Sequence, residues 1–247
     1  MSDRIHLDSI FLDWPYDPRS ISVRLVNGKD DREVIQMRIE LGLLQLETTG
    51  RPDGERPNGE DSYYGHLLQL EIAQSDHFEL TDEQCLECDR EFVEFYHRRI
   101  CWLAMQEYSK AVLDADHTLG LMNFCSRHSS DQQWVLSHEQ YRPFVMYHRI
   151  QSYAMSLLVE DAPEDAIESI NRGLGQLKDL YTKQGLEDDF DEDDLVAKLV
   201  ELRESLRDQF EVGRTLREKL SDAIAGEQYE LAARIRDEIQ KKRRGPR

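Results

Sequence analysis

The sequence has no long apolar segment and few cysteines. Nowhere do apolar residues run uninterrupted for the roughly 18 positions that a bilayer-spanning helix requires. The first residues, Met-Ser-Asp-Arg-Ile-His, lack the apolar stretch of a signal peptide. Four cysteines in 247 residues do not make a disulfide framework. We therefore expect a soluble, cytoplasmic protein that has no membrane partner.

Basic residues are also scarce. Lysine and arginine total 31 against 50 acidic residues, which gives a formal net charge of -19 at pH 7. A surface of this sign repels phosphate backbones, so we do not expect nucleic acid as the main partner. The exception is the C-terminal tail from Lys241 to Arg247, which holds five positive charges. We interpret this tail as a solvated terminus that binds nucleic acid weakly at most.

Signatures of common catalytic sites are missing. No serine stands in a Gly-x-Ser-x-Gly motif, and the histidines show no spacing typical of a triad. The segment from Asn27 to Asp30 lacks the glycine spacing and the hydroxyl residue of a phosphate-binding loop. We expect no catalytic residue, no cofactor and no enzymatic activity. An enzyme with an unrecognised site remains the alternative.

One pair of cysteines has a spacing that metal sites use. Cys85 and Cys88 form a CxxC motif, and a zinc site would need two further ligands. The nearest candidates in the sequence are Cys101, Cys125, His77 and His97. Because Cys85 and Cys88 share one face of a helix, we interpret them as small packed residues and predict no metal site. Zinc binding remains the alternative.

The first 60 residues predict a small β region. Apolar residues alternate from Ile21 to Leu25 and again from Ile35 to Leu41, and Asn27-Gly28 between them favours a β-hairpin. After Gly42 the alternation changes phase, which predicts a bulge that bends the second strand. The glycines and prolines between residues 48 and 61 predict a loop and a boundary.

Residues 61–184 predict a helical domain. Capping-box patterns begin at Thr81 and at Ser137, and Pro163 favours a further helix start. Two helix pairs match at an offset of 50 or 51 residues, most clearly Tyr96-His97-Arg98 with Tyr147-His148-Arg149. This repetition resembles degenerate tetratricopeptide-like hairpins in two copies. The expected fold is mainly α, with tetratricopeptide-like helical hairpins after a small N-terminal β-hairpin region and an antiparallel helical hairpin at the C-terminus.

A series of aromatic residues follows the repeated helices. We interpret the series as core between these helices, while a concave peptide-binding face is the alternative. Its members are Phe92, Phe95, Tyr96, Trp102, Trp134, Tyr141, Phe144 and Tyr147.

Residues 185–212 predict an acidic linker and one helix. The segment from Glu187 to Asp194 is almost wholly acidic, which is typical of a solvated linker. Apolar residues then recur at intervals of four, three and four, which fits either a packed helix or a short coiled coil. These residues are Leu195, Leu199, Leu202 and Leu206.

Residues 213–247 predict two short antiparallel helices. Thr215 and Glu218 have the spacing of a capping box, and Gly226 permits a sharp turn. Apolar stripes lie on both sides of that turn. The stripes consist of Leu216, Leu220 and Ile224, and of Tyr229, Ala232, Ala233, Ile235 and Ile239.

This segment resembles the UVR motif that excinuclease subunits B and C share. The resemblance rests on Leu-Arg-Glu-Lys-Leu from Leu216 and on Tyr-Glu-Leu-Ala-Ala-Arg-Ile-Arg-Asp-Glu-Ile from Tyr229. It implies a helical hairpin that pairs with another such hairpin. The residues expected at the partner surface are Leu216, Leu220, Ile224, Tyr229, Ala232, Ala233, Arg236 and Ile239. The beginning of the chain, from Asp8 to Tyr16, resembles a group of bacterial proteins that also end in this motif, which implies the architecture and no activity.

The expected function is a non-enzymatic adaptor that binds another protein through the C-terminal hairpin. The resemblance leaves three partners open, namely a second copy of the chain, an excinuclease subunit of the UvrB/UvrC type, and a Clp-type chaperone-protease. An accessory role in nucleotide excision repair and a role as a Clp regulator are therefore the alternative functions.

Overall fold

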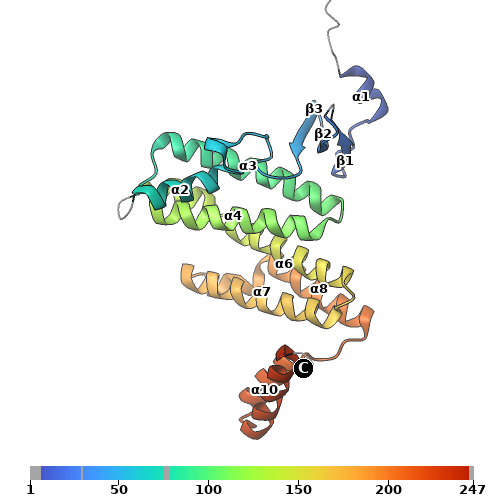
Figure 1. Ribbon diagram of the computed structural model, residues 1–247. Helices are drawn as coiled ribbons and strands as arrows, with labels where there is room; N and C mark the ends of the chain where they lie inside the picture. Colours follow the sequence, from blue (N-terminus) through green and yellow to red (C-terminus); the bar gives the residue numbers. More distant parts are fainter. Residues whose placement is uncertain (1–6, 29, 75–77, 245–247) are drawn as a thin grey trace, which may run out of the picture. The chain divides into compact units, whose positions relative to one another are not determined.

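The computed structural model describes residues 7–28, 30–74 and 78–244 (Figure 1). The fold is mainly helical, with one small sheet near the N-terminus and a helical pair at the C-terminus, which confirms the expected fold class. The chain divides into two compact units at Ser152, so that α6 begins in the first and ends in the second. Within the described ranges, no helix combines the length and the apolar character needed to cross a bilayer.

The first unit contains the sheet and the first helices. Its elements are α1 (Asp8–Asp13), β1 (Ser22–Asn27), β2 (Glu33–Ile39), β3 (Gly42–Glu47), the 3-10 helix η1 (Pro57–Gly59), α2 (Tyr63–Gln74), α3 (Asp82–Ala104), α4 (Tyr108–His128), α5 (Gln132–Glu139) and the first part of α6 (Arg142–Val159). The second unit continues with α7 (Pro163–Gln184), the 3-10 helix η3 (Glu187–Glu192), α8 (Asp194–Phe210), α9 (Leu216–Ala225) and α10 (Tyr229–Arg244).

The sheet is an antiparallel meander of three strands. The predicted hairpin is present, because β1 pairs with β2. The predicted bulge is wrong: the chain reverses at Glu40 and Leu41, and Gly42 begins β3, which pairs back onto β2. A tight turn also shifts the phase of the alternating apolar residues, because a new strand begins after it. One face of the sheet packs against α3 through Ile35, Leu46 and Trp102.

Helix starts in the first unit follow their capping residues. Thr81 caps α3 and forms the predicted capping box, in which its amide donates to Gln84 at 2.9 Å. The start predicted at Ser137 is wrong, because Ser137 lies inside α5 and α6 begins at Arg142. Asp131 caps α5 instead, since its carboxylate accepts from two amides of the first turn at 2.9 and 3.0 Å.

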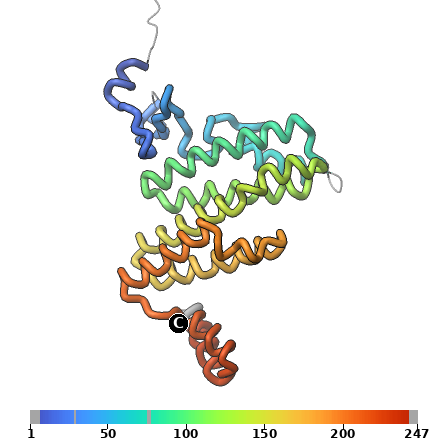
Figure 2. Tube along the Cα trace, turned by 180° about the vertical axis from the view of Figure 1, so that it is seen from behind, coloured from blue at the N-terminus to red at the C-terminus, as the bar shows by residue number. Residues whose placement is uncertain are grey.

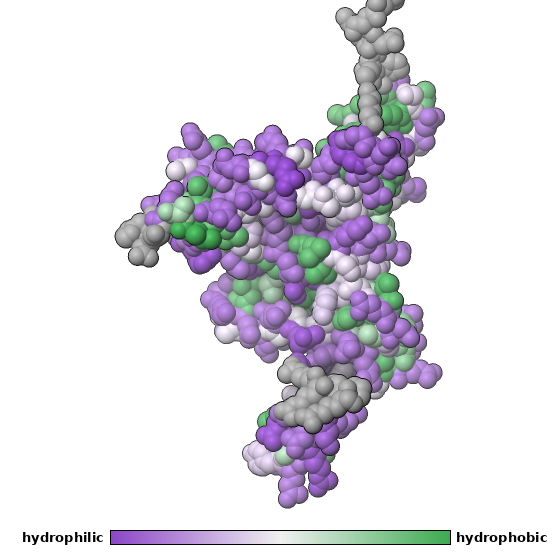
Figure 3. All heavy atoms as spheres, in the orientation of Figure 1, coloured by the Kyte–Doolittle hydropathy of each residue, from purple (hydrophilic) through white to green (hydrophobic). Residues whose placement is uncertain are grey.

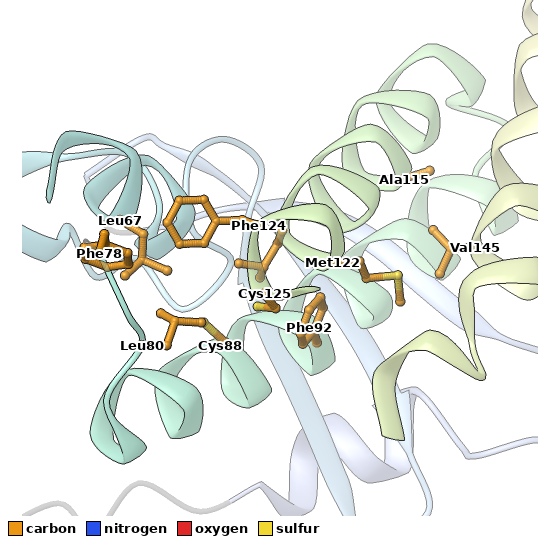
Figure 4. Packing of buried hydrophobic residues seen from close by; sticks show 11 residues of the cluster. Leu67, Phe78, Leu80, Cys88, Phe92, Ala115, Met122, Phe124, Cys125 and Val145 are labelled. Atoms are coloured by element: carbon orange, nitrogen blue, oxygen red, sulfur yellow. The ribbon is translucent and has the colours of Figure 1, made fainter. Parts of the chain in front are cut away.

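A shared core holds α2, α3, α4 and the start of α6 together. Its buried residues come from all four helices and from the segment before α3, and Figure 4 shows most of them. They are Leu67, Phe78, Leu80, Cys88, Phe92, Ala115, Leu121, Met122, Phe124, Cys125 and Val145.

In the second unit, the acidic segment folds onto the helices beside it. It forms η3, where the buried Phe190 ring lies 5.6 Å from the Tyr181 ring of α7. Asp193 then caps α8 and also accepts from the Tyr181 hydroxyl at 2.7 Å. The acidic side chains of η3 are exposed to solvent, as predicted, but one phenylalanine among them supplies an apolar anchor. Of the two interpretations of the leucine series, the structure shows a packed helix, since α8 lies against α7 with Leu199 and Leu206 buried.

The two members of the sequence repeat share some features. Ala115 and Ala166 are both fully buried, as small residues at helix crossings are. The matched arginines differ, because Arg98 is buried beside Asp114 whereas Arg149 pairs with Asp116 at the surface. The likeness to tetratricopeptide hairpins stays a prediction.

Candidate protein-interaction site

The C-terminal hairpin consists of α9 and α10, which run antiparallel (Figure 2). Its core is small: Ala223, Ala232 and Ile235 are buried between the helices. Leu216, Leu220 and Ile239 pack against this core and are partly buried. The alanines permit close approach of the two helices, and Gly226 follows α9 where the chain turns. The hairpin therefore folds around very few side chains.

The first turn of α9 is capped as the sequence predicts. The Thr215 hydroxyl accepts from the amide of Glu218 at 3.3 Å, and the Glu218 carboxylate accepts from the amide of Thr215 at 2.8 Å. Two of the free amide donors at the helix start are thus satisfied. This box fixes where α9 begins and how the preceding chain enters it.

The same turn is tied to α7 and α8 by polar contacts. Glu218 also accepts from the Asn171 side chain at 3.0 Å and forms an ion pair with Arg207. Glu168 of α7 accepts from the Thr215 hydroxyl at 3.0 Å and pairs with Arg217 at 3.1 Å. Burial acts to raise the pKa of Glu218, but hydrogen bonds from the Thr215 amide, Arg207 and Asn171 outweigh it and hold the pKa below its usual value. The ionised carboxylate therefore holds this junction.

An apolar groove runs along the outside of the hairpin. It has a volume of about 410 Å³ and is lined by Arg217, Leu220, Ser221, Ile224, Arg236, Ile239 and Gln240. Ile224 is 54% exposed, which is high for a large aliphatic side chain. The face of the hairpin visible in Figure 3 is mainly hydrophilic. Arginine is enriched at protein–protein interfaces, and the centre of such an interface is more apolar than the remaining surface.

The structure divides the predicted partner residues into three groups. Leu220, Ile224, Arg236 and Ile239 meet in the groove. Leu216 and Ala232 face other parts of their own chain. Tyr229 and Ala233 are exposed and do not line the groove. The prediction missed Arg217, Ser221 and Gln240, although their spacing from Leu220, Ile224 and Arg236 places them on the same helix faces.

A comparison with protein-family models identifies this segment. Residues 212–244 match the UvrB/UvrC motif, UVR. The match confirms the resemblance seen in the sequence and is confined to the last part of the chain. No curated protein and no solved structure was found that matches the chain. We call α9 and α10 the UVR hairpin from here on.

The first unit contains a charged cluster on α3. The side chain of Arg51, from the loop after β3, is 1% exposed and pairs with Glu87 at 2.9 Å and Glu94 at 3.2 Å. Burial raises the pKa of Glu94 to about 7, although Arg51 and Arg90 oppose the shift. Glu91 is fully buried and accepts from the first two amides of α2 at 2.6 and 2.9 Å. These ion pairs and hydrogen bonds hold the loop and α2 against α3. The sequence pattern did not predict them.

The cysteine pair of the CxxC motif is largely enclosed. Cys88 is fully buried beside Cys125, whose hydrogen bond raises the pKa of the Cys88 thiol together with burial. Burial also raises the pKa of Cys85 to about 11. In the ranges that the structure describes, no three His, Cys, Asp or Glu residues are placed to hold a metal ion.

The aromatic series is divided between core and surface. Phe92, Phe95 and Trp102 are buried, whereas Tyr96 and Tyr141 are 38% and 58% exposed. The exposed members border a cavity of about 690 Å³.

The first six residues, Lys29, His77 and the last three residues of the basic tail lie outside the described residues.

Proposed function

We propose that this chain is a non-enzymatic adaptor whose UVR hairpin pairs with a helical hairpin of a second polypeptide. The observation that supports it is the open groove between α9 and α10, in which Ile224 remains 54% exposed. Among the hairpin residues whose side chains are described, three are buried, and so small a core leaves apolar surface that a second hairpin would cover.

The size of the groove bears on the kind of partner. Fully covering a large aliphatic side chain contributes about 1.5–3 kcal/mol. Leu220, Ile224 and Ile239 are partly covered already, so one such strip stabilises a complex only modestly. A partner with a strip of its own, placed face to face, would double the covered area. Such pairing of like surfaces favours another UVR-type hairpin over an unrelated peptide.

Charges at the edge of the groove would select among such partners. Arg217 and Arg236 border it, so a partner hairpin with acidic residues beside its apolar strip is favoured. A second copy of this chain carries the same apolar strip and, on α10, the exposed acid Asp237, which pairs with Arg236 at 3.3 Å. A second copy of the chain is therefore the first partner to test. Excinuclease subunits of the UvrB/UvrC type and Clp-type components follow.

Sedimentation of the full chain tests the proposal with a matched pair of variants. Ile224→Glu places a carboxylate in the groove, where burying it unpaired is costly. Leu231→Glu is the control, because Leu231 is also exposed on the hairpin but does not line the groove. We expect wild type and Leu231→Glu to associate, with themselves or with purified excinuclease or Clp subunits, and Ile224→Glu to fail. If all three proteins behave alike with each partner, the proposal is wrong.

A further inference from the structure

A second groove lies in the first unit, along one face of α3. Five α3 residues that follow each other at intervals of three or one line it, together with residues of α4, α5 and the start of α6. The lining consists of Asp89, Phe92, Val93, Tyr96, Arg99, Thr118, Met122, Ser137, His138, Tyr141, Phe144 and Val145. At about 690 Å³, this groove has room for several side chains.

The groove has an apolar floor and an open aromatic rim. Phe92, Met122 and Val145 are buried at its base, and Figure 4 shows that they come from three different helices. Val93 and Tyr141 on the rim are 54% and 58% exposed. An apolar floor below an exposed aromatic rim is suited to an apolar side chain of a ligand that extends beyond the groove.

Arg99 is a buried cation that forms no ion pair with a described carboxylate, although the charge of Asp114 acts on it at longer range. Its side chain is 1% exposed and donates to His148 Nδ1 at 3.3 Å and to Thr118 Oγ1 at 3.0 Å. Burial lowers the pKa of Arg99 to about 10 and that of His148 to about 4, so near pH 7 the arginine is charged and the histidine is neutral. No carboxylate oxygen of the described residues lies within 4 Å of this guanidinium.

The neighbouring Arg98 shows what Arg99 lacks. Arg98 is equally buried, but Asp114 accepts from it at 2.7 and 3.0 Å, and two backbone carbonyls complete its contacts. A buried charge is ordinarily paired in this way. An anion bound in the groove would give Arg99 the same kind of partner.

The other end of the groove is acidic. Asp89 Oδ1 accepts from Trp134 Nε1 at 2.8 Å and from His138 Nε2 at 2.7 Å, while Oδ2 has no hydrogen bond to any described residue. Asp89 and Arg99 are ten positions apart on α3, which corresponds to about 15 Å along the helix. The groove is thus acidic at one end, apolar in the middle and basic at the other.

We propose that this groove binds the C-terminal end of a polypeptide, with its terminal carboxylate at Arg99 and its last apolar side chain on the floor. An extended chain of four or five residues spans about 15 Å, which matches the distance to Asp89, where a basic residue of the ligand fits. A small free acid would fill only one end. An internal segment would also have to bury backbone on both sides of the contact, whereas a chain end buries it on one.

Binding of a synthetic peptide to the full chain tests this site. The probe is an acetylated pentapeptide with lysine first, alanine at the second and third positions, and leucine and phenylalanine last, prepared as the free acid and as the C-terminal amide. We expect the amide to bind at least tenfold more weakly than the acid. In Arg99→Gln the acid should bind as weakly as the amide, and the affinity of the amide should not change.

A second pair of variants guards against loss of folding in Arg99→Gln. Val93→Glu adds a negative charge to the exposed rim and should abolish binding of the acid. Leu113→Glu is its control, because Leu113 is 68% exposed on α4 and does not line the groove. Thermal melts of all variants show whether each is folded.

Three outcomes would overturn the proposal. The carboxylate has no role if acid and amide bind equally, and the groove is not the site if Val93→Glu binds like Leu113→Glu. If 3-phenylpropionate binds as tightly as the peptide, the site takes a small free acid and not a chain end. None of these results depends on the UVR hairpin, so they test this site separately from the proposed function.

Discussion

Glu218 of α9 accepts a hydrogen bond from Asn171 of α7 at 3.0 Å while it also accepts from the amide of Thr215 in its own capping box. One carboxylate therefore fixes the start of the UVR hairpin and ties that start to the helices before it. Arg207 adds an ion pair to the same carboxylate. The hairpin joins the rest of its unit through charged and polar groups at one end, which leaves the groove open.

Glu218→Gln is expected to loosen the hairpin from α7 and α8. Because the pKa of Glu218 is held below its usual value, its ionised form stabilises the junction above the unfolded pKa, near 4.5. That contribution is lost as the pH falls through the lower folded pKa. Relative to the intrinsic rate, which itself falls in acid, hydrogen exchange in α9 should thus rise in the wild type at acidic pH. In Glu218→Gln it should already be high near pH 7, and equal exchange in both proteins there would contradict this role.

Two adjacent alanines of α10 are expected to respond differently to a charge. Ala232 is buried against α9, whereas Ala233 is exposed. Ala232→Glu should unfold the hairpin, because it buries a carboxylate in a close helix crossing. Ala233→Glu should leave the hairpin folded in the free chain. Circular dichroism together with hydrogen exchange in α10 separates the two variants, and similar loss of structure in both would be inconsistent with this packing.

The hairpin was predictable because its determinants are local. A capping box, a glycine at the turn and two apolar stripes all lie within about 30 residues. The residues that face the groove were harder to predict from the sequence. Ala232 and Ala233 are the same type of residue, and the face that α10 turns toward α9 decides which one is buried.

Elements fixed by distant contacts were harder to predict. The phase change at Gly42 fits a bulge and a tight turn equally well, and pairing of β3 with β2 decides between them. Asp131 and Ser137 both have side chains that can cap a helix, so the sequence alone does not decide between them. In the structure Asp131 caps α5. In the aromatic series, Phe95 is buried and the adjacent Tyr96 is exposed at the α3 groove, a difference that depends on the helices packed around them. The sequence also does not show that Arg98 forms an ion pair with Asp114 while Arg99 forms none.

The buried pair of Arg98 and Asp114 is expected to be a major source of stability in the first unit. Asp114→Ala should lower the free energy of unfolding by about 3–5 kcal/mol, because it leaves a buried guanidinium without its counter-ion. Asp116→Ala is the matched control, since Asp116 pairs with Arg149 at the surface and should cost less than about 1 kcal/mol. Denaturant unfolding of both variants provides the measurement, and costs of similar size would argue against the assignment.

Stability should fall between pH 6.5 and pH 4 through His148. Burial, together with the charge of Arg99, lowers the pKa of His148 to about 4, whereas the unfolded side chain titrates near 6.5. The unfolded state therefore binds a proton in this range that the folded state does not. The loss is on the order of 3 kcal/mol by pH 4. Asn at this position retains an acceptor for Arg99 without titrating, so thermal melts of His148→Asn should depend less on pH than those of the wild type. Parallel pH profiles would exclude this role.

Hydrogen exchange measured in the full chain tests most directly whether the UVR hairpin is the surface that binds a second polypeptide. Exchange is compared between the dilute chain and the chain concentrated or saturated with a purified UVR-containing partner, for wild type and Ile224→Glu. We expect association to slow exchange in α9 and α10 of the wild type, and to leave exchange in Ile224→Glu unchanged. Association that protects other helices while α9 and α10 exchange as fast as in the dilute chain would contradict the account.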